Sequence, residues 1–295
     1  MKKLLVLSVC MFFFVQTYAV EPLWQGKGRI VISSDGNEHD DDDWAATPMS
    51  LAIIASRSLQ ANVPLYTYSD HVWGSSNDFP NRFGLSAYEH MHVSALGSKY
   101  WFGYENTEFI CAVDNPERAY DAMAREINLS SEDNPLFIIA AGPMQVVGEG
   151  LNRSDTTKHK YVTVISHSLW NNKHSTNPNV KCGWDHHTEG WTWDQMEESF
   201  EQVNFCMIAN QNGGKDYPGL FAPKEDFEWI RTSSARNDSK YKVGAWDFLY
   251  ERVACCQKKN DKYFDVSDSG MLLFLFSGIE KTSPQILEEF MCEMP

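Results

Sequence analysis

The chain is short of positive charge. It carries 25 Lys and Arg residues against 40 Asp and Glu, which gives a formal net charge of −15 over 295 residues. Nucleic acids are bound through clustered Lys and Arg, so this balance argues against a nucleic-acid partner. A metal cation, or a substrate held by hydrogen bonds and stacking, suits such a surface better.

Other absences narrow the function further. There is no Gly-x-Ser-x-Gly sequence, which argues against an esterase-type hydrolase with a merely structural calcium ion. There is no Cys-x-x-Cys pair among the seven cysteines, which argues against a structural zinc site. No apolar run reaches the roughly 20 residues of a membrane-spanning helix. No internal repeat or low-complexity linker divides the chain.

The first residues have the pattern of an export signal. Lys2 and Lys3 precede an apolar run from Leu4 to Val15, and Thr17-Tyr18-Ala19 offers small residues for cleavage. We predict that residues 1–19 are a signal peptide cleaved after Ala19, and that the mature protein is periplasmic or secreted. A lipoprotein alternative at Cys10 would leave a shorter apolar run and ranks second.

Short β-branched runs alternate with helical patterns along the rest of the chain. Strands are predicted at 29–34, 63–68, 136–141, 161–165 and 205–209, and helices at 44–59, 84–97, 115–129, 244–257, 269–278 and 284–291. The helix at 44–59 is expected to be amphipathic. The alternation predicts one α/β domain over residues 20–295, with a mostly parallel sheet flanked by helices on both faces. Polar segments follow the predicted strands, at the edge where such sheets bind ligands.

The strongest chemical feature is an acidic run from Asp35 to Asp43, in which six of nine residues are acidic. Carboxylates packed at a strand end repel one another, and a hard cation such as Ca²⁺, which takes about six to eight oxygen ligands, removes the repulsion. Alternatively, Asp40 to Asp43 cap the following helix and match its dipole. Capping does not account for Asp35, which comes directly after a buried strand.

Three segments resemble the nucleoside hydrolase superfamily. Asp35–Asp41, Asp-Gly-Asn-Glu-His-Asp-Asp, resembles its metal loop in the form found in exported bacterial members. Ala140–Val146, Ala-Ala-Gly-Pro-Met-Gln-Val, resembles its Gly-Pro-Leu-Thr-Asn segment, and Asp265–Gly270 resembles its late aspartate at a helix start. The matches occur in family order and span most of the mature chain. Ser33 stands where the family has a further aspartate, a departure that bears on the nucleoside substrate more than on the fold or the metal.

The resemblance implies a Rossmann-like fold of nucleoside-hydrolase type and a bound calcium ion. Its expected ligands are the carboxylates of Asp35, Asp40, Asp43 and Asp268 and the backbone carbonyl of Gln145. Asp42 is expected to face a substrate hydroxyl, with Asp41 left open as an alternative within the run. Asp35 or Asp40 would deprotonate the water that attacks the sugar.

The remaining expected site residues contact the sugar or protonate the leaving group. The resemblance places Asn171, Asn172 and His174 near sugar hydroxyls, although Asn-rich segments also form ordinary turns. Trp184, in a segment that also holds Trp170, Trp191 and Trp193, is expected to stack on a ring, whereas Trp44, Trp229 and Trp246 are expected in the core. His187 is the favoured acid, with His186, His71, His167 and His174 as alternatives. For each of these histidines, an ordinary surface position is the simpler interpretation.

We therefore expect an exported, calcium-dependent hydrolase of a glycosidic bond, either an N-riboside or a carbohydrate O-glycoside. The substrate would be a small molecule or a carbohydrate. The alternative is a non-catalytic, metal-stabilised carbohydrate-binding protein on the same fold. The sequence leaves the oligomeric state open, a homo-oligomer included.

Overall fold

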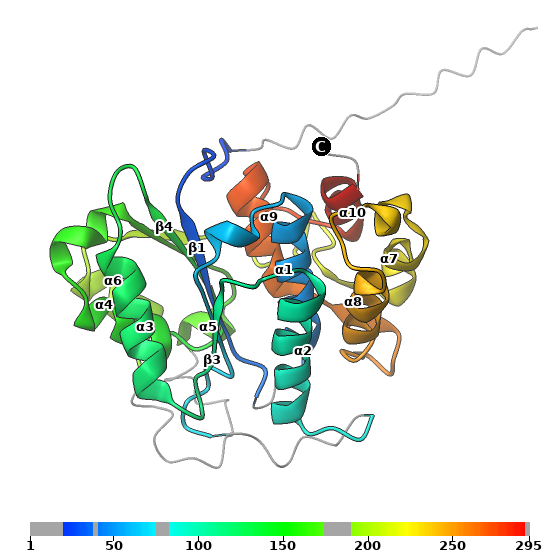
Figure 1. Cartoon of the computed structure of the whole chain (residues 1–295), viewed down its shortest axis with the longest axis horizontal. Coiled ribbons are helices and arrows are strands. Elements are labelled where there is room, and N and C mark those ends of the chain that lie inside the picture. The colour runs from blue at the N-terminus through cyan, green and yellow to red at the C-terminus, as the bar shows by residue number, and fades with distance from the viewer. Residues whose placement is uncertain (1–19, 38–40, 75–82, 174–189, 293–295) are drawn as a thin grey trace, which may run out of the picture.

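The computed structural model describes residues 20–37, 41–74, 83–173 and 190–292. At its centre is a six-stranded parallel sheet in the order β3-β2-β1-β4-β5-β6 (Figure 1). The strands are β1 (Arg29–Ser34), β2 (Leu65–Tyr68), β3 (Glu108–Cys111), β4 (Leu136–Ala141), β5 (Val162–Ser166) and β6 (Asn204–Met207). The predicted α/β class is confirmed. The strand order reverses between β1 and β4, and such switch points are where open α/β sheets bind ligands.

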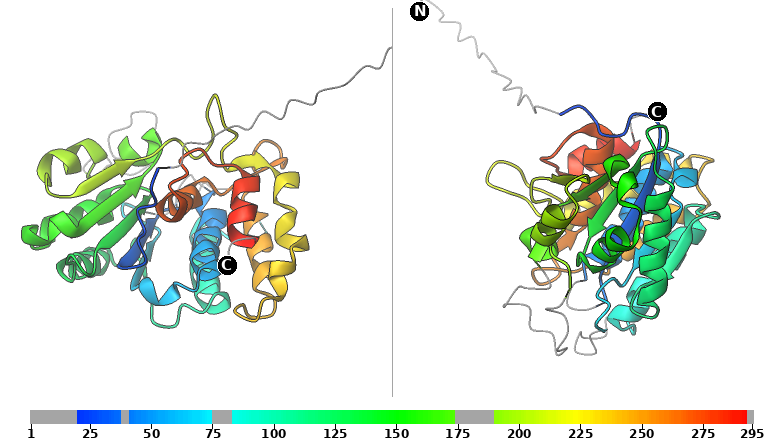
Figure 2. Two further views of the ribbon diagram at one scale, coloured as in Figure 1. Left: turned by 90° about the horizontal axis from the view of Figure 1, so that it is seen from above. Right: turned by 90° about the vertical axis from the view of Figure 1, so that its left-hand side faces the viewer.

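Helices cover both faces of the sheet, as Figures 1 and 2 show. Alternate residues of β1 belong to different cores, Val31 to one and Ile30 and Ile32 to the other. The Val31 core includes α3 (Pro116–Asn128), α4 (Gln145–Arg153) and α6 (Trp193–Ser199). The opposite core includes α1 (Asp43–Ser56), α2 (Ala87–Trp101), α8 (Ala245–Val253), α9 (Gly270–Ser277) and α10 (Pro284–Cys292).

The shorter elements complete the chain. They are α5 (Leu169–Lys173), α7 (Trp229–Thr232) and an antiparallel pair of β7 (Phe221–Pro223) with β8 (Tyr263–Asp265). The sequence pattern missed β3, which is a four-residue edge strand with only one fully buried residue. It also missed α4, because Gly148 and Gly150 weaken the helical pattern. Both glycines have a packing reason, since a Cβ would approach Trp191 or Met123 to 2.2 Å.

Helix α1 differs from expectation. It was predicted to be amphipathic, but all of its residues are buried, because α2, α8, α9 and α10 pack around it. Pro48 interrupts its hydrogen bonds by removing the N–H that would reach the Trp44 carbonyl one turn earlier. The Ser94 hydroxyl of α2 donates to that carbonyl instead, at 2.6 Å. Ser94 in turn accepts from Arg252 Nε of α8 at 2.9 Å, so one hydroxyl links three helices.

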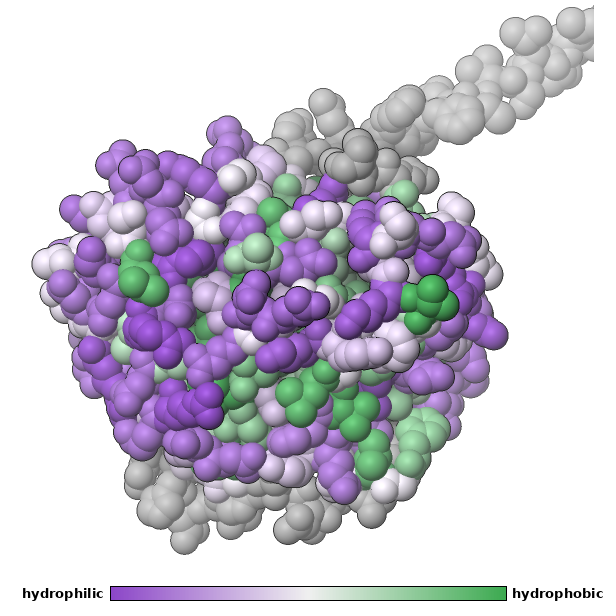
Figure 3. All heavy atoms as spheres, viewed as in Figure 1, coloured by the Kyte–Doolittle hydropathy of each residue, from purple (hydrophilic) through white to green (hydrophobic). Residues whose placement is uncertain are grey.

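The surface is mainly polar. The face shown in Figure 3 is mostly hydrophilic, with hydrophobic side chains in small groups. Trp44, Trp229 and Trp246 lie in the core, as expected. Within the described ranges, no helix is both long and apolar enough to cross a bilayer. The predicted signal peptide lies outside the described residues and stays a prediction.

The Ser94 linkage can be tested by substitution. Ser94→Ala should lower the free energy of unfolding by about 1–3 kcal/mol, because the buried Arg252 Nε loses its acceptor and the Trp44 carbonyl loses a donor. Pro48→Ala in the same background should recover part of the loss by restoring the missing N–H. Urea unfolding measures both. Ser98→Ala is the control, since this hydroxyl only donates back to its own helix. Equal losses in the Ser94 and Ser98 variants would contradict the linkage.

Candidate functional site

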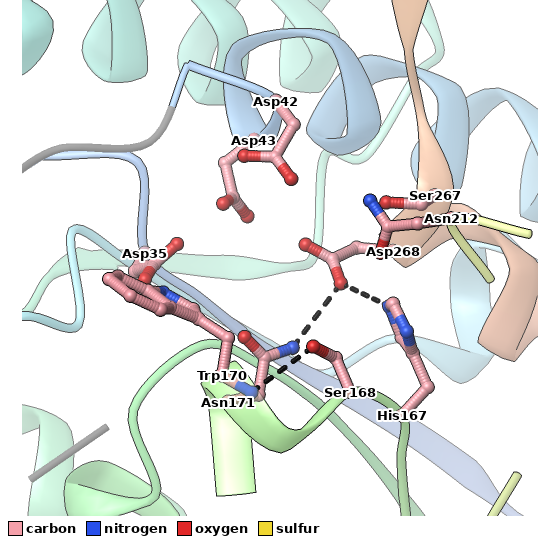
Figure 4. Close-up of a pocket in the computed structure, with 10 residues that line it drawn as sticks. All are labelled: Asp35, Asp42, Asp43, His167, Ser168, Trp170, Asn171, Asn212, Ser267 and Asp268. Atoms are coloured by element: carbon pink, nitrogen blue, oxygen red, sulfur yellow. Dashed lines mark hydrogen bonds and ion pairs between the residues drawn. The ribbon is translucent and has the colours of Figure 1, made fainter. Parts of the chain in front are cut away.

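A polar cavity of about 150 Å³ lies beyond the carboxyl ends of β1 and β5, beside the switch point of the sheet. Figure 4 shows its lining, which comes from four separate stretches of the chain. The lining residues are Asp35, Asp42, Asp43, His167, Ser168, Trp170, Asn171, Asn212, Ser267 and Asp268. Acidic side chains far apart in sequence thus meet in one place.

Asp35 is held at the end of β1 by close backbone packing. Its N–H donates to the Ala141 carbonyl at 3.2 Å, which extends the pairing of β1 with β4. Gly142 follows on β4, and a Cβ there would come within 3.0 Å of the Asp35 backbone nitrogen and Cβ. Gly36 has φ +83°, and a Cβ at this position would lie 2.7 Å from Asp43 Cβ. Glycine at both positions lets the acidic segments approach.

Two side chains anchor the turn that follows Asp35. The amide nitrogen of Asn37, which is fully buried, donates to the carbonyls of His71 and Gly74 at 3.1 and 2.7 Å. The indole N–H of Trp44 donates to the Gly36 carbonyl at 2.8 Å. The turn is therefore tied both to the segment after β2 and to α1, and this fixes Asp35 relative to Asp43.

Asp42 and Asp43 begin α1. Asp42 occupies the N-cap position, yet its side chain makes no capping hydrogen bond and lines the cavity instead. This observation weighs against the capping alternative for Asp42. Asp43 is the first residue of the helix and is 1% exposed.

The carboxylates that line the cavity repel one another. Burial, and then the neighbouring charges of Asp35, Asp268 and Asp42, raise the pKa of Asp43 well above the usual range. Asp43 Oδ1 is buried and has no hydrogen-bond partner among the described residues. A carboxylate oxygen that is buried, unsatisfied and surrounded by like charge is well placed to accept a cation.

Asp268 reaches the cavity from the turn before α9. Its Oδ1 is 2.6 Å from His167 Nε2 and 3.4 Å from the Asn171 amide nitrogen, which donates to it. The backbone N–H of Gln211 donates to His167 Nδ1 at 3.2 Å, so Nδ1 is an acceptor and Nε2 carries the proton given to Asp268. Figure 4 shows the second Asp268 oxygen facing the side of the cavity lined by Asp42 and Asp43.

Ser168 shapes the segment after β5. It adopts a left-handed backbone with φ 72°, which is uncommon for a residue other than glycine. Its hydroxyl accepts the backbone N–H of Trp170 at 3.2 Å. This turn directs Trp170 and Asn171 to the cavity, whereas Asn172 faces away. The Asn172 amide accepts from Ser166 and contacts the Met207 sulfur.

The expected site residues therefore fall into three groups. The cavity brings together Asp35, Asp42, Asp43, Asn171 and Asp268. Asn172 and Gln145 do not line it, and the Gln145 side chain bonds Tyr120 and the Trp191 backbone. Asp40, His174, Trp184, His186 and His187 lie outside the described residues and stay predictions.

The residues of the acidic run do not all face the cavity. The Asp41 carboxylate lies 2.5 Å from Lys258 Nζ and is not part of the cavity lining. Of the histidine alternatives, His167 lines the cavity, whereas His71 does not. Sequence reasoning missed Asn212 and Ser267. Asn212 could have been found from the rule that residues just after a predicted strand meet at the ligand-binding edge.

Asp70, at the end of β2, is a further buried carboxyl near the site. Its Oδ2 accepts from the hydroxyls of Ser33 and Thr67. Burial raises its pKa to about 8, and Asp35 adds to the shift. Asp70 is therefore mainly protonated at neutral pH. Ser33, the residue that departs from the family pattern, donates to this carboxyl, and its hydrogen bond lowers the pKa and so offsets part of the effect of burial.

Comparison with known proteins gives three similarities. No family model matches the chain. A protein of Formosa agariphila named Uncharacterized protein P22 is 28% identical over 254 residues, which cover 85% of this chain and 84% of that protein. The inosine-uridine preferring nucleoside hydrolase from Bacillus anthracis has a TM-score of 0.43 at 12% identity and covers 83% of this chain and 81% of its own.

The crystal structure of the effector protein XOO4466 has a TM-score of 0.42 at 11% identity, with 91% and 94% of the two chains covered. Similarities at this level decide neither family nor function.

The buried Asp70 predicts a pH-dependent stability. Between about pH 4 and pH 8 the folded chain keeps a proton that the unfolded chain releases. The contribution of Asp70 to stability is therefore fully present below about pH 4 and is lost as the pH rises to about 8. Asp70→Asn should remove this loss, so its stability relative to wild type should rise by up to about 1.4 kcal/mol per pH unit across that window.

Urea unfolding in chelator, from pH 5 to 9, measures this difference. Asp133→Asn is the control, because the Asp133 side chain is fully exposed. If the Asp70 variant and wild type keep a constant difference at every pH, Asp70 is not a buried neutral carboxyl.

Proposed function

We propose that this chain is a calcium-dependent hydrolase that cleaves a glycosidic bond, in an N-riboside or a carbohydrate O-glycoside. The observation that carries the proposal is the convergence of Asp35, Asp42, Asp43 and Asp268 on one cavity at the sheet edge. Asp268 lies more than 200 residues from the others in sequence.

The donor set suits a hard divalent cation. All of these side chains offer carboxylate oxygens, which Ca²⁺ prefers, and Asn171 and Asn212 also line the cavity. Asp43 offers a buried oxygen without a hydrogen-bond partner in the described part of the chain. The residues that would hold calcium are Asp35, Asp43 and Asp268, with Asp42 beside them. The expected contributions of Asp40 and of the Gln145 carbonyl remain part of the proposal.

A bound calcium ion supplies positive charge that orients sugar hydroxyls and makes a water molecule easier to deprotonate. Asp35, at the rigid end of β1, is placed to take that proton. The negative charge of the remaining aspartates favours the oxocarbenium-like state of the sugar ring. His167 acts on Asp268: its fixed tautomer donates to one oxygen and so orients the other toward the cavity.

The size and lining of the cavity favour a single sugar unit. Its volume of about 150 Å³ lies below the roughly 300–1,000 Å³ typical of pockets for drug-sized ligands. Asn171, Asn212 and Asp42 can bond hydroxyl groups, and Trp170 offers a ring face for stacking. The predicted signal peptide favours a carbohydrate, because nucleoside salvage is mainly internal.

Calcium binding is the first test. Calorimetry on chelator-treated protein should give about one site per chain. Asp43→Asn and Asp268→Asn should each weaken binding by at least about 10- to 100-fold, because losing even an outer partner of a metal ligand costs that much. Asp41→Asn is the matched control. It removes the same charge from the same run, but the native Asp41 pairs with Lys258 and does not line the cavity. If Asp41→Asn weakens calcium as much as Asp268→Asn does, the effect is only one of net charge.

Catalysis is tested separately from binding. Asp35→Asn that still binds calcium should lose about 10²- to 10⁴-fold in the rate of sugar release, the usual value of a general base. The assay follows reducing-sugar release from a panel of nucleosides and glycosides. Full activity in this variant would remove the base role. Calcium binding by the wild-type chain without turnover of any glycoside would favour the binding-protein alternative.

A further inference from the structure

A second group of potential metal ligands lies on the other side of the sheet switch, at edge strand β3. It consists of His92 on α2, Cys111 at the end of β3 and Asp114 in the turn that follows. One ligand atom from each residue lies within 4.8 Å of the other two. None of these residues lines the acidic cavity.

The local structure holds these groups together. The Ser86 capping box fixes the start of α2, and Tyr88 and His92 lie one turn apart on the same side of that helix. The His92 ring packs against Tyr88 and Tyr68, with centroids 4.5 and 5.3 Å apart. On the β3 side, the N–H groups of Ala112 and Val113 bond the carbonyls of Tyr68 and Ser69, which positions the turn carrying Asp114.

His92 and Cys111 each have an unusual environment, and Asp114 lies beside them. His92 Nδ1 is buried and has no hydrogen-bond partner within the described ranges. Burial raises the pKa of the Cys111 thiol, and the Asp114 carboxylate adds to this effect. The Tyr88 hydroxyl contacts both Asp114 oxygens, at 2.7 and 2.9 Å. A nitrogen, a sulfur and a carboxylate, with a phenol beside them, thus share one small space.

We propose that His92, Cys111 and Asp114 form a site for a divalent transition-metal ion of the zinc class. Imidazole, thiolate and carboxylate are the ligands that zinc takes in proteins, whereas calcium and magnesium prefer oxygen alone. A tetrahedral zinc ion needs its ligand atoms about 3.3–3.8 Å apart. The ligand atoms of the group lie within 4.8 Å of one another, so the longest separation has to close by about 1 Å. The fourth position is open to water or to Tyr88.

The absence of a Cys-x-x-Cys pair does not bear on this site. A Cys-x-x-Cys pair is typical of zinc sites held by paired cysteines, whereas this site uses a single cysteine. The ion would tie α2 to the edge strand and displace the thiol proton. Zinc should therefore raise the melting temperature.

The test uses Co²⁺ and Zn²⁺ alone, added to the full chain in excess Ca²⁺ so that the acidic cavity does not compete. Cobalt should give a near-ultraviolet thiolate charge-transfer band, which zinc removes by displacement. Cys111→Ser should abolish the band. His92→Gln and Asp114→Asn should weaken cobalt binding by at least about 10- to 100-fold, since loss of an outer-shell partner alone costs that much.

Two controls keep the assignment specific. Cys206→Ser removes another half-buried free cysteine, on β6, and should leave the band and the affinity unchanged. Asp268→Asn disrupts the acidic cavity and should also leave them unchanged. Asp114→Asn alters an exposed side chain, so it tests the site without endangering the fold. A wild-type chain with no cobalt band, or a Cys111→Ser chain that keeps it, would overturn the proposal.

Discussion

Repulsion between like charges is the constraint on which the rest of the structure depends. Asp35, Asp42, Asp43 and Asp268 face a space of only about 150 Å³, and burial, together with the charges of its neighbours, raises the pKa of Asp43. Such an arrangement persists only if the surrounding fold holds the carboxylates in place. The glycines that allow close approach, the Asn37 and Trp44 hydrogen bonds to the turn and the His167 contact to Asp268 all do this. The fold is built to bring charge together at one point of the sheet edge.

Two nearby aspartates do not add to the negative charge of the cavity, because one is paired with a lysine and the other holds a proton. Asp41 is drawn out of the cavity by Lys258, so one member of the acidic run is neutralised by an ordinary ion pair. Asp70 is kept neutral by burial at the end of β2, where Ser33 and Thr67 donate to it. An aspartate at position 33 would place a second carboxyl against Asp70. The serine therefore avoids a further repulsion, which gives its departure from the family pattern a physical reason.

The sequence could predict what depends on periodicity and on strand ends. The buried runs at β1 and β4, the parallel sheet and the placement of Asp35 at its edge followed from such patterns, whereas Asp268 was expected there only from the resemblance to the nucleoside hydrolase superfamily. The orientation of consecutive residues could not be predicted. Asp41 and Asp42 are adjacent yet face Lys258 and the cavity, because the chain is turning into a helix. Asn171 and Asn172 diverge for the same reason. Burial of α1 on every side depends on helices from distant segments, which no local pattern reveals.

The two groups of candidate ligands lie at the same edge of the sheet but differ in ligand type, so we expect them to prefer different metal ions. Both lie where parallel strands end, and each includes residues of a helix: α1, which follows β1, and α2, which follows β2. At β1 four carboxylates converge, and their mutual repulsion favours a hard cation over a proton. At β3 a histidine and a cysteine meet a single carboxylate, so a softer ion gains more there than calcium does. Calcium would bind weakly at the β3 group, because calcium binds thiols poorly. Zinc would bind weakly at the β1 group, because zinc gains little from a crowded set of carboxylates. Ligand type, more than position in the fold, would therefore decide which ion each end of the sheet retains.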